Sequence, residues 1–314
     1  MAEHTLLIVS EDNAEFAERI SALQLPELRI RMASSSSEVS DQIESVDIIL
    51  AFPKLIADNL SSARNLKWLQ TTSVGVDVLI KPGMPRNYVL TNARGILGPK
   101  LTEYAFAHIL TYKKRILENR ELQRLKKWDT VFTDSLEGET LVVLGTGDIG
   151  SNIAMVAKAF GMRTVGFRTK KKPVEYFDEV YGSEDLSTAL SQGDYVVSVL
   201  PATPETNDII RTETIAQMKE GVVFMNIGRG NAVNEEDVLK AVQSGKIARA
   251  ILDVFKKEPL PVDSPLWNEK NIIITPHMAG YAGVTALVKS FAENYERFHS
   301  EKELLHRVDF DKGY

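Results

Sequence analysis

The glycine-rich segment GTGDIG at Gly145–Gly150 constrains the fold of this chain more than any other feature. It follows the apolar run LVVL and precedes a segment, 151–160, with helical periodicity. In a turn from a buried strand to a helix, the first glycine permits a sharp bend, the second lets the backbone approach a phosphate, and the third allows close helix packing. A purely structural turn is the alternative, but this context favours a dinucleotide site at the helix N-terminus.

Short apolar runs alternate with helical segments along the whole chain, which is typical of parallel sheets with helices on both faces. The runs in the first half are TLLIV, DIILA, LKWLQTTS and YVLTNA, and those after residue 138 are ETLVVLG, RTVGFR, DYVVSVLP, VVFMNIG, ARAILDVF and NIIITP. The later six suffice for a doubly wound sheet. Apolar spacing predicts one long helix from Leu101 to Arg120, and an amphipathic helix from Val284 to about His306 that packs on the first domain. The sequence therefore predicts an α/β protein.

Composition narrows the classes of partner. A chain of 314 residues with 44% hydrophobic content has the length for roughly two domains. A net charge of -6 gives no electrostatic reason to expect nucleic acid or an anionic membrane. The chain has no cysteine, which excludes disulfides, thiolate metal sites and a cysteine nucleophile, and no metal is expected. With neither a signal-like N-terminus nor a run of membrane-spanning length, a cytoplasmic location is the default expectation.

The residues after the next strand-like run indicate which dinucleotide is preferred. Arg168 stands where an acidic residue would hold a ribose 2′-hydroxyl, and Thr169 and Lys170–Lys172 follow it. A guanidinium binds a phosphate in a planar forked geometry, and a hydroxyl can add a hydrogen bond. This cluster predicts NADP as the cofactor, with NAD possible. A solvated basic turn is the alternative.

Arg229, Glu258 and His277 each follow an apolar strand-like run downstream of the glycine turn. A guanidinium can bind the carboxylate and carbonyl oxygens of a substrate, and an imidazole can exchange a proton with it. A carboxylate can hydrogen-bond the far ring nitrogen and fix the tautomer. A structural arginine, a structural histidine and a solvated acid are the alternatives. Downstream of a dinucleotide site, however, this order favours hydride transfer to and from a carbonyl acid.

Five motifs in chain order resemble the D-isomer-specific 2-hydroxyacid dehydrogenase family. They are LVVLGTGDIG, VLPATPET at Val199–Thr206, NIGRG at Asn226–Gly230, LDVFKKEPLP at Leu252–Pro261 and TPHMAG at Thr275–Gly280, with TTSVGVD at Thr71–Asp77 extending the match. The resemblance implies a Rossmann cofactor domain, 99–284, inserted in a flavodoxin-like substrate domain made of 1–98 and 285–314. It also implies NAD(P)-dependent interconversion of a 2-ketoacid and a D-2-hydroxyacid, by a homodimer formed through the cofactor domain.

The motifs also predict the residues of the site. Arg229, Glu258 and His277 are the expected catalytic residues. The expected cofactor contacts are Gly145, Gly147, Asp148, Ile149, Gly150, Arg168, Thr169, Lys170, Leu200, Pro201, Thr206, Ile227 and Asp253. The family position of Asp253 binds the nicotinamide carboxamide, with a capping or loop role as the alternative. The amides of Val74 and Gly75 resemble the family's carboxylate-binding loop, or form an ordinary glycine turn, and Phe52 lines the substrate pocket or belongs to the core.

The substrate stays open at this stage, because glyoxylate, hydroxypyruvate and larger branched or aromatic 2-ketoacids are handled by the same triad. The chain resembles the short glyoxylate/hydroxypyruvate reductase-like form, and a serine-binding regulatory domain after Tyr314 is not expected. A preference for NADP favours reduction of the 2-ketoacid as the physiological direction. The rival from another class is a non-catalytic NAD(P)H sensor resembling a corepressor. Formate dehydrogenase, which pairs its histidine with glutamine, is disfavoured by Glu258.

Overall fold

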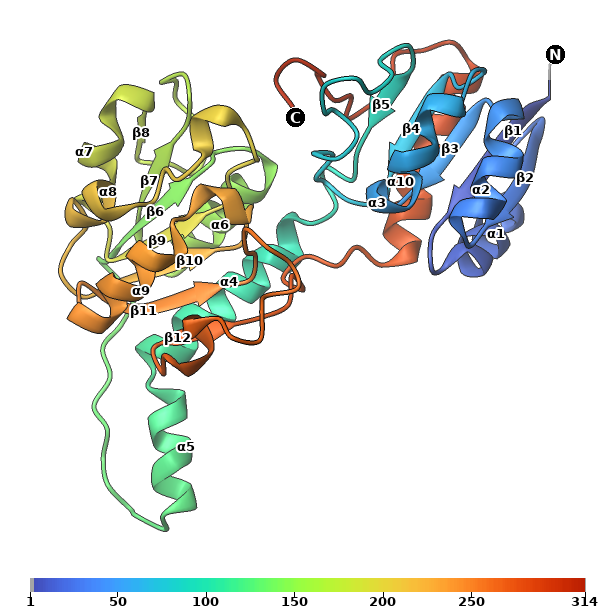
Figure 1. Ribbon diagram of the computed structural model, residues 1–314. Helices are drawn as coiled ribbons and strands as arrows, with labels where there is room; N and C mark the ends of the chain where they lie inside the picture. The colour runs from blue at the N-terminus through green and yellow to red at the C-terminus, as the bar shows by residue number, and fades with distance from the viewer. Residues whose placement is uncertain (1–2, 314) are drawn as a thin grey trace. The chain divides into compact units, whose positions relative to one another are not determined.

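The computed structural model describes residues 3–313 and separates the chain into two compact units. One unit contains the residues up to Leu97 together with those from Ala282 onward, and the other is Gly98–Tyr281. Each unit is built on a parallel sheet flanked by helices (Figure 1). The predicted α/β fold with two domains, one inserted in the other, is confirmed.

The first unit has a five-stranded sheet of order β2-β1-β3-β4-β5, which is the flavodoxin-like order. The strands are β1 (His4–Val9), β2 (Leu28–Ala33), β3 (Ile48–Ala51), β4 (Trp68–Thr71) and β5 (Val89–Thr91). Strands β3 and β4 are buried throughout, because helices cover both faces of a parallel sheet. The sequence prediction missed β2, whose two arginines break the apolar run at this edge of the sheet.

Helices from both ends of the chain cover this sheet. They are α1 (Asn13–Ala22), α2 (Ser36–Gln42), α3 (Pro53–Ile56) and α10 (Val284–His299). Helix α10 lies beside α1, and its Phe291 stacks on Trp68 of β4 with ring centroids 5.1 Å apart. The expected return of the C-terminal helix to the first domain is confirmed, although the helix ends at His299 rather than near His306.

The second unit has a seven-stranded parallel sheet of order β12-β11-β10-β9-β6-β7-β8. The strands are β6 (Thr140–Leu144), β7 (Arg163–Phe167), β8 (Glu179–Tyr181), β9 (Tyr195–Ser198), β10 (Val222–Asn226), β11 (Ile247–Leu252) and β12 (Ile272–Ile274). The six expected runs are all strands here, and the missed β8 is a three-residue edge strand without a readable period. The strand order reverses between β6 and β9, which is where doubly wound sheets bind ligands.

The helices of the second unit correct one expectation. They are α4 (Gly98–Lys113), α5 (Ile116–Arg124), α6 (Asp148–Ala159), α7 (Leu186–Leu190), α8 (Thr212–Ala216) and α9 (Glu235–Ser244). The single helix predicted over 101–120 is wrong, because Arg115 adopts a left-handed conformation with φ 49° between α4 and α5. Helix α4 buries an apolar face, whereas α5 buries no residue and projects from the rest of its unit (Figure 1). No helix within residues 3–313 has the length and apolarity needed to cross a membrane.

Candidate active site

The glycine-rich turn after β6 leaves room for a phosphate. Gly145 has φ 104°, and a Cβ on Gly150 would stand 1.9 Å from the Gly145 carbonyl oxygen, so α6 packs directly against the turn. A Cβ built on Gly147, the N-cap of α6, would meet no atom within 4 Å. Open space beside the first amides of a helix, which lack intrahelical acceptors, is the environment in which an anion binds. The expected contacts Asp148 and Ile149 are the first residues of this helix.

Basic and hydroxyl side chains gather after β7. The Arg168 Nε atom is buried and has no hydrogen-bond partner among the described residues. Thr169 and Lys170 follow and are exposed, while the Lys171 ammonium lies 5.4 Å from the centre of the Tyr181 ring. A buried unpartnered guanidinium nitrogen next to exposed cations fits a phosphate group on the ribose.

The loops after β9 and β10 form a closely packed support. Leu200, Thr206 and Ile227 are buried, Pro201 is half-buried, and Thr206 Oγ1 donates to the Pro201 carbonyl at 2.7 Å. A Cβ on Gly228 would lie 2.7 Å from Leu200 N, so the two loop backbones touch. These expected cofactor contacts share the carboxyl edge of the sheet with the glycine turn.

Arg229 sits in a loop that its neighbours hold on both sides. The Asn226 side chain accepts from Gly228 N at 3.3 Å and donates to the Arg229 carbonyl at 3.0 Å. Arg229 Nη1 donates to the Gly228 carbonyl at 2.8 Å. A Cβ on Gly230 would stand 2.0 Å from the Phe255 carbonyl carbon, so this loop lies against the loop after β11. Only a glycine permits that approach.

Glu258 and His277 meet as the sequence suggests. Glu258 Oε2 lies 2.9 Å from His277 Nδ1, and its Oε1 accepts from Phe255 N at 3.1 Å. A carboxylate only accepts, so Nδ1 carries the hydrogen and Nε2 is the nitrogen left for chemistry. The histidine side chain is half-exposed, and no hydrogen bond to its Nε2 occurs within residues 3–313. The peptide bond between Glu258 and Pro259 is cis.

Asp253, directly after β11, is only 2% exposed and holds the segment that carries His277. Its carboxylate accepts from Thr275 Oγ1 at 2.6 Å, Met278 N at 2.9 Å and Ala279 N at 3.0 Å. The capping or loop role that competed with a cofactor contact is therefore present in this structure. The sequence did not point to Thr275 as a site residue. Nor did it point to Tyr104 of α4, whose Oη lies 2.6 Å from Thr275 Oγ1. Two sequence features could have pointed to these residues: the threonine that opens TPHMAG, and the position of Tyr104 in the predicted helix.

The expected substrate contacts of the first unit follow β3 and β4. Phe52 is exposed immediately after β3, so it does not belong to the core. The carbonyl of Ser73 accepts from Thr71 Oγ1, that of Val74 from Asn92 Nδ2, and that of Gly75 from Ser73 Oγ. The amides of Val74 and Gly75 donate no hydrogen bond within the described part of the chain. The carbonyls of this loop accept hydrogen bonds from the protein, and its amides remain available as donors. Such a loop is suited to bind a carboxylate.

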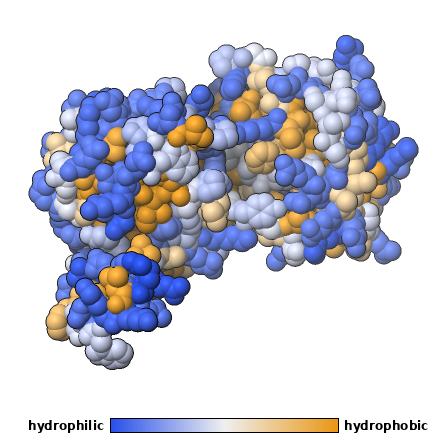
Figure 2. All heavy atoms as spheres, turned by 60° about the horizontal axis from the view of Figure 1, so that its bottom comes forward, coloured by the Kyte–Doolittle hydropathy of each residue, from blue (hydrophilic) through white to orange (hydrophobic). Residues whose placement is uncertain are grey.

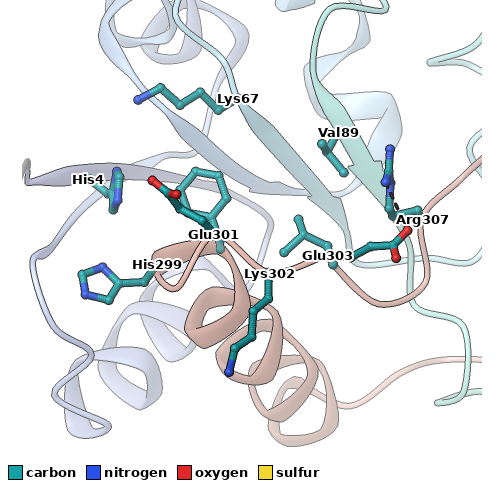
Figure 3. A pocket seen from close by; sticks show the side chains of 10 residues that line it. His4, Lys67, Val89, His299, Glu301, Lys302, Glu303 and Arg307 are labelled. Atoms are coloured by element: carbon teal, nitrogen blue, oxygen red, sulfur yellow. Dashed lines mark hydrogen bonds and ion pairs between the residues drawn. The ribbon is translucent and has the colours of Figure 1, made fainter.

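A pocket of about 470 Å³ in the first unit lies away from these residues. Its walls begin at His4, Lys67 and Val89, at or next to the starts of β1, β4 and β5, whereas Phe52 and Val74 follow the other ends of strands. The remaining walls are Phe298, His299, Glu301, Lys302, Glu303, Leu304 and Arg307. Figure 3 shows its charged side chains spread around the hollow rather than converging on one point. None of the expected site residues lines it.

Comparison with known proteins shows the family to which the chain is similar. The family model "D-isomer specific 2-hydroxyacid dehydrogenase, NAD binding domain" matches residues 106–279. A D-isomer specific 2-hydroxyacid dehydrogenase family protein from Aeromonas salmonicida subsp. salmonicida A449 is 41% identical, with a TM-score of 0.93 over 99% of this chain and 100% of that chain.

Two further solved structures carry cofactors. A D-isomer specific 2-hydroxyacid dehydrogenase from Xanthobacter autotrophicus Py2, in complex with NADPH and MES, is 29% identical with a TM-score of 0.90 over 100% of both chains. An NADPH-dependent glyoxylate/hydroxypyruvate reductase from Sinorhizobium meliloti, in complex with NADP and sulfate, is 26% identical with a TM-score of 0.89 over 99% of this chain and 100% of that chain. The matched motifs, the strand orders and the family model together place this chain in the D-isomer specific 2-hydroxyacid dehydrogenase family of NAD(P)-dependent oxidoreductases.

Proposed function

We propose that this protein is an NADP-preferring reductase that interconverts a 2-ketoacid and a D-2-hydroxyacid, with His277 as the acid and base. The observation that carries the proposal is the 2.9 Å contact between His277 Nδ1 and Glu258 Oε2. It lies at the carboxyl edge of the sheet that bears the glycine-rich turn, next to the loop of Arg229. The two NADP(H)-bound relatives support the cofactor.

The proposed residues divide the work of reduction. NADPH, when bound, supplies a hydride to the carbonyl carbon of the ketoacid. Arg229 binds the carboxylate and the carbonyl oxygen, and His277 Nε2 gives its proton to that oxygen as the C–O double bond becomes single. Glu258 stabilises the protonated ring through Nδ1. From the first unit, Val74 and Gly75 are proposed to bind the substrate carboxylate and Phe52 to contact the substrate side chain.

The preference for NADP over NAD is supported by the chemistry of the loop after β7. Arg168 presents a buried nitrogen without a partner, and Thr169 and Lys170 are exposed beside it. No carboxylate stands in the segment 168–172 to accept from a ribose hydroxyl. NAD has no 2′-phosphate and would make fewer contacts with this loop. In this proposal NAD is therefore the weaker cofactor.

A panel of ketoacids assayed with NADPH and NADH tests the function. We expect NADPH oxidation with glyoxylate, hydroxypyruvate or a larger branched or aromatic 2-ketoacid, and a product of D configuration where the product is chiral. Replacing His277 with Asn should lower kcat about 100-fold or more, since general acid catalysis typically contributes that much. Tight NADPH binding without consumption across the panel would instead identify a sensor.

We also propose a homodimer formed through the second unit. Helix α5 and the segment after it expose Ile116, Leu117, Leu125, Trp128 and Phe132. This arm projects from its unit, and Figure 2 shows a small cluster of hydrophobic residues among the hydrophilic ones at its surface. A second copy of the chain is the proposed partner, because exposed aromatic side chains of this size mark association surfaces.

The expected cytoplasmic location stays a prediction.

A further inference from the structure

A chain of hydrogen bonds runs behind the turn that carries His277. Tyr104 Oη lies 2.6 Å from Thr275 Oγ1, which lies 2.6 Å from Asp253 Oδ1. Because a carboxylate only accepts, Thr275 must donate to Asp253 and Tyr104 must donate to Thr275. The chain therefore has one direction, from α4 through the end of β12 to the end of β11.

The acceptor at the end of this chain also holds the turn itself. Asp253 Oδ1 and Oδ2 accept from the amides of Met278 and Ala279, and the Asp253 carbonyl accepts from His277 N at 2.8 Å. His277 has φ 53°, a left-handed conformation that residues with a Cβ rarely adopt. Such a conformation persists only where the surrounding contacts enforce it.

The outer end of the chain is suited to act as a permanent donor. Burial raises the pKa of Tyr104 to about 12, against the opposing hydrogen bond with Thr275, so its hydroxyl keeps its hydrogen at neutral pH. His108, one helical turn along α4, packs against the Tyr104 ring with centroids 4.5 Å apart. Burial lowers the pKa of His108, against the opposing charge of Asp253, so it covers the tyrosine as a neutral ring near pH 7.

We propose that Asp253, Thr275 and Tyr104 are positioning residues that fix the left-handed turn of His277 and thereby aim its Nε2 at the substrate. This inference rests on the proposed function, in which that nitrogen transfers the proton. A carboxylate has about four lone-pair positions, and the turn takes three of those of Asp253. A contact with the nicotinamide carboxamide would use the one that remains, so the two roles of Asp253 are separable.

Paired substitutions at Thr275 test the positioning role. Thr275→Val keeps the shape and removes the hydroxyl, and we expect kcat for ketoacid reduction to fall about tenfold. The KM for ketoacid and the Kd for NADPH should stay within about twofold of the wild type, since the proposed function assigns Thr275 no contact with either. Thr275→Ser restores the hydroxyl and should restore kcat. Tyr104→Phe, a milder change at the outer end, should lower kcat about threefold.

Tyr112→Phe is the matched control, because Tyr112 is a half-buried tyrosine of the same helix outside the hydrogen-bonded chain. It should leave kcat unchanged. An unchanged kcat in both Thr275→Val and Tyr104→Phe would overturn the proposal. A weakened NADPH Kd in those variants with kcat preserved would overturn it as well, and would assign the chain to cofactor binding.

Amide hydrogen exchange separates this proposal from the proposed function. In the protein without ligand, the amides of residues 277–279 should exchange at least about tenfold faster in Thr275→Val than in the wild type. Equal exchange rates would exclude the positioning role even in an active enzyme. If the wild type reduces no ketoacid, the proposed function fails, but the exchange measurement still decides whether the chain fixes the turn.

Discussion

The contact between His277 and Glu258 depends on the local geometry of the loop after β11. Phe255 N donates to Oε1 of Glu258 within this loop, and Oε2 of the same carboxylate faces His277 Nδ1. The residue types and their places after strands were predictable from the sequence. The turn at His277 and its dependence on Asp253 were not, because a left-handed residue leaves no periodic signal.

Removing the charge of Glu258 should slow ketoacid reduction. In Glu258→Gln the side chain keeps its size, but the protonated imidazole loses a compensating carboxylate 2.9 Å from Nδ1. We expect kcat for ketoacid reduction to fall about tenfold, while the Kd for NADPH stays within about twofold of the wild type. Glu235→Gln is the control, since Glu235 accepts from Lys256 N in the same region without touching His277. An unchanged kcat in Glu258→Gln would refute the dyad.

Reversing the charge at Arg168 should change cofactor selection. In Arg168→Asp a phosphate would face a carboxylate instead of a guanidinium, so kcat/KM with NADPH should fall about 100-fold and with NADH less than about threefold. Lys240→Asp on α9 alters the net charge equally at an exposed site and should leave the ratio of the two cofactors unchanged. Equal losses with NADPH and NADH would remove the assignment of Arg168.

At the scale of elements, the break between α4 and α5 creates the proposed dimer arm. The helical period continues past Lys113, but no apolar neighbour in its own unit covers α5. Replacing Trp128 and Phe132 together with Ser should weaken self-association about 100-fold or more, because both rings are exposed and together supply much of the apolar area. Sedimentation velocity measures the effect, and Val262→Ser, at an exposed apolar residue outside the arm, is the control. A monomeric wild type would contradict the proposed dimer.

The start of β8 is tied to β7 and α6 by a carboxylate. Asp178 accepts hydrogen bonds from Lys158 Nζ at 2.7 Å and from Thr164 N at 2.8 Å. The hydrogen bond from Lys158 lowers the pKa of Asp178 below its ordinary value of 3.8. Burial opposes this shift, and the hydrogen bonds from Thr164 add to it. A lowered pKa stabilises the fold above the ordinary value, and this contribution is lost as the pH falls through the folded value.

Asp178→Asn should therefore reduce the free energy of unfolding at pH 7 by about 1 kcal/mol, a figure discounted because the side chain is 38% exposed. The difference from the wild type should shrink as the pH falls below 3.8. Urea midpoints at pH 7 and pH 3 measure it. A constant difference at both pH values would show that the charge of Asp178 contributes nothing.

At the scale of the whole molecule, the chain enters the second unit once and leaves it once, at 97/98 and 281/282. The second unit is therefore continuous, while the first needs α10, whose Phe291 and Tyr295 are buried beside Trp68 and α1. We expect a fragment 98–281 to fold alone and bind NADPH, and a fragment 1–97 to stay unfolded until 282–314 is added. Circular dichroism and calorimetry test this, and a folded 1–97 fragment would contradict it.

The sequence by itself determined the parallel α/β architecture, the glycine-rich turn and the residue types of the triad. Period, apolar runs and turn glycines act locally, so they can be read along the chain. The tertiary structure decided the edge strands β2 and β8, the break at Arg115, and the chain from Tyr104 through Thr275 to Asp253. Those features depend on which neighbour covers a segment or accepts its hydrogen bond, and that neighbour lies up to 171 residues away in sequence.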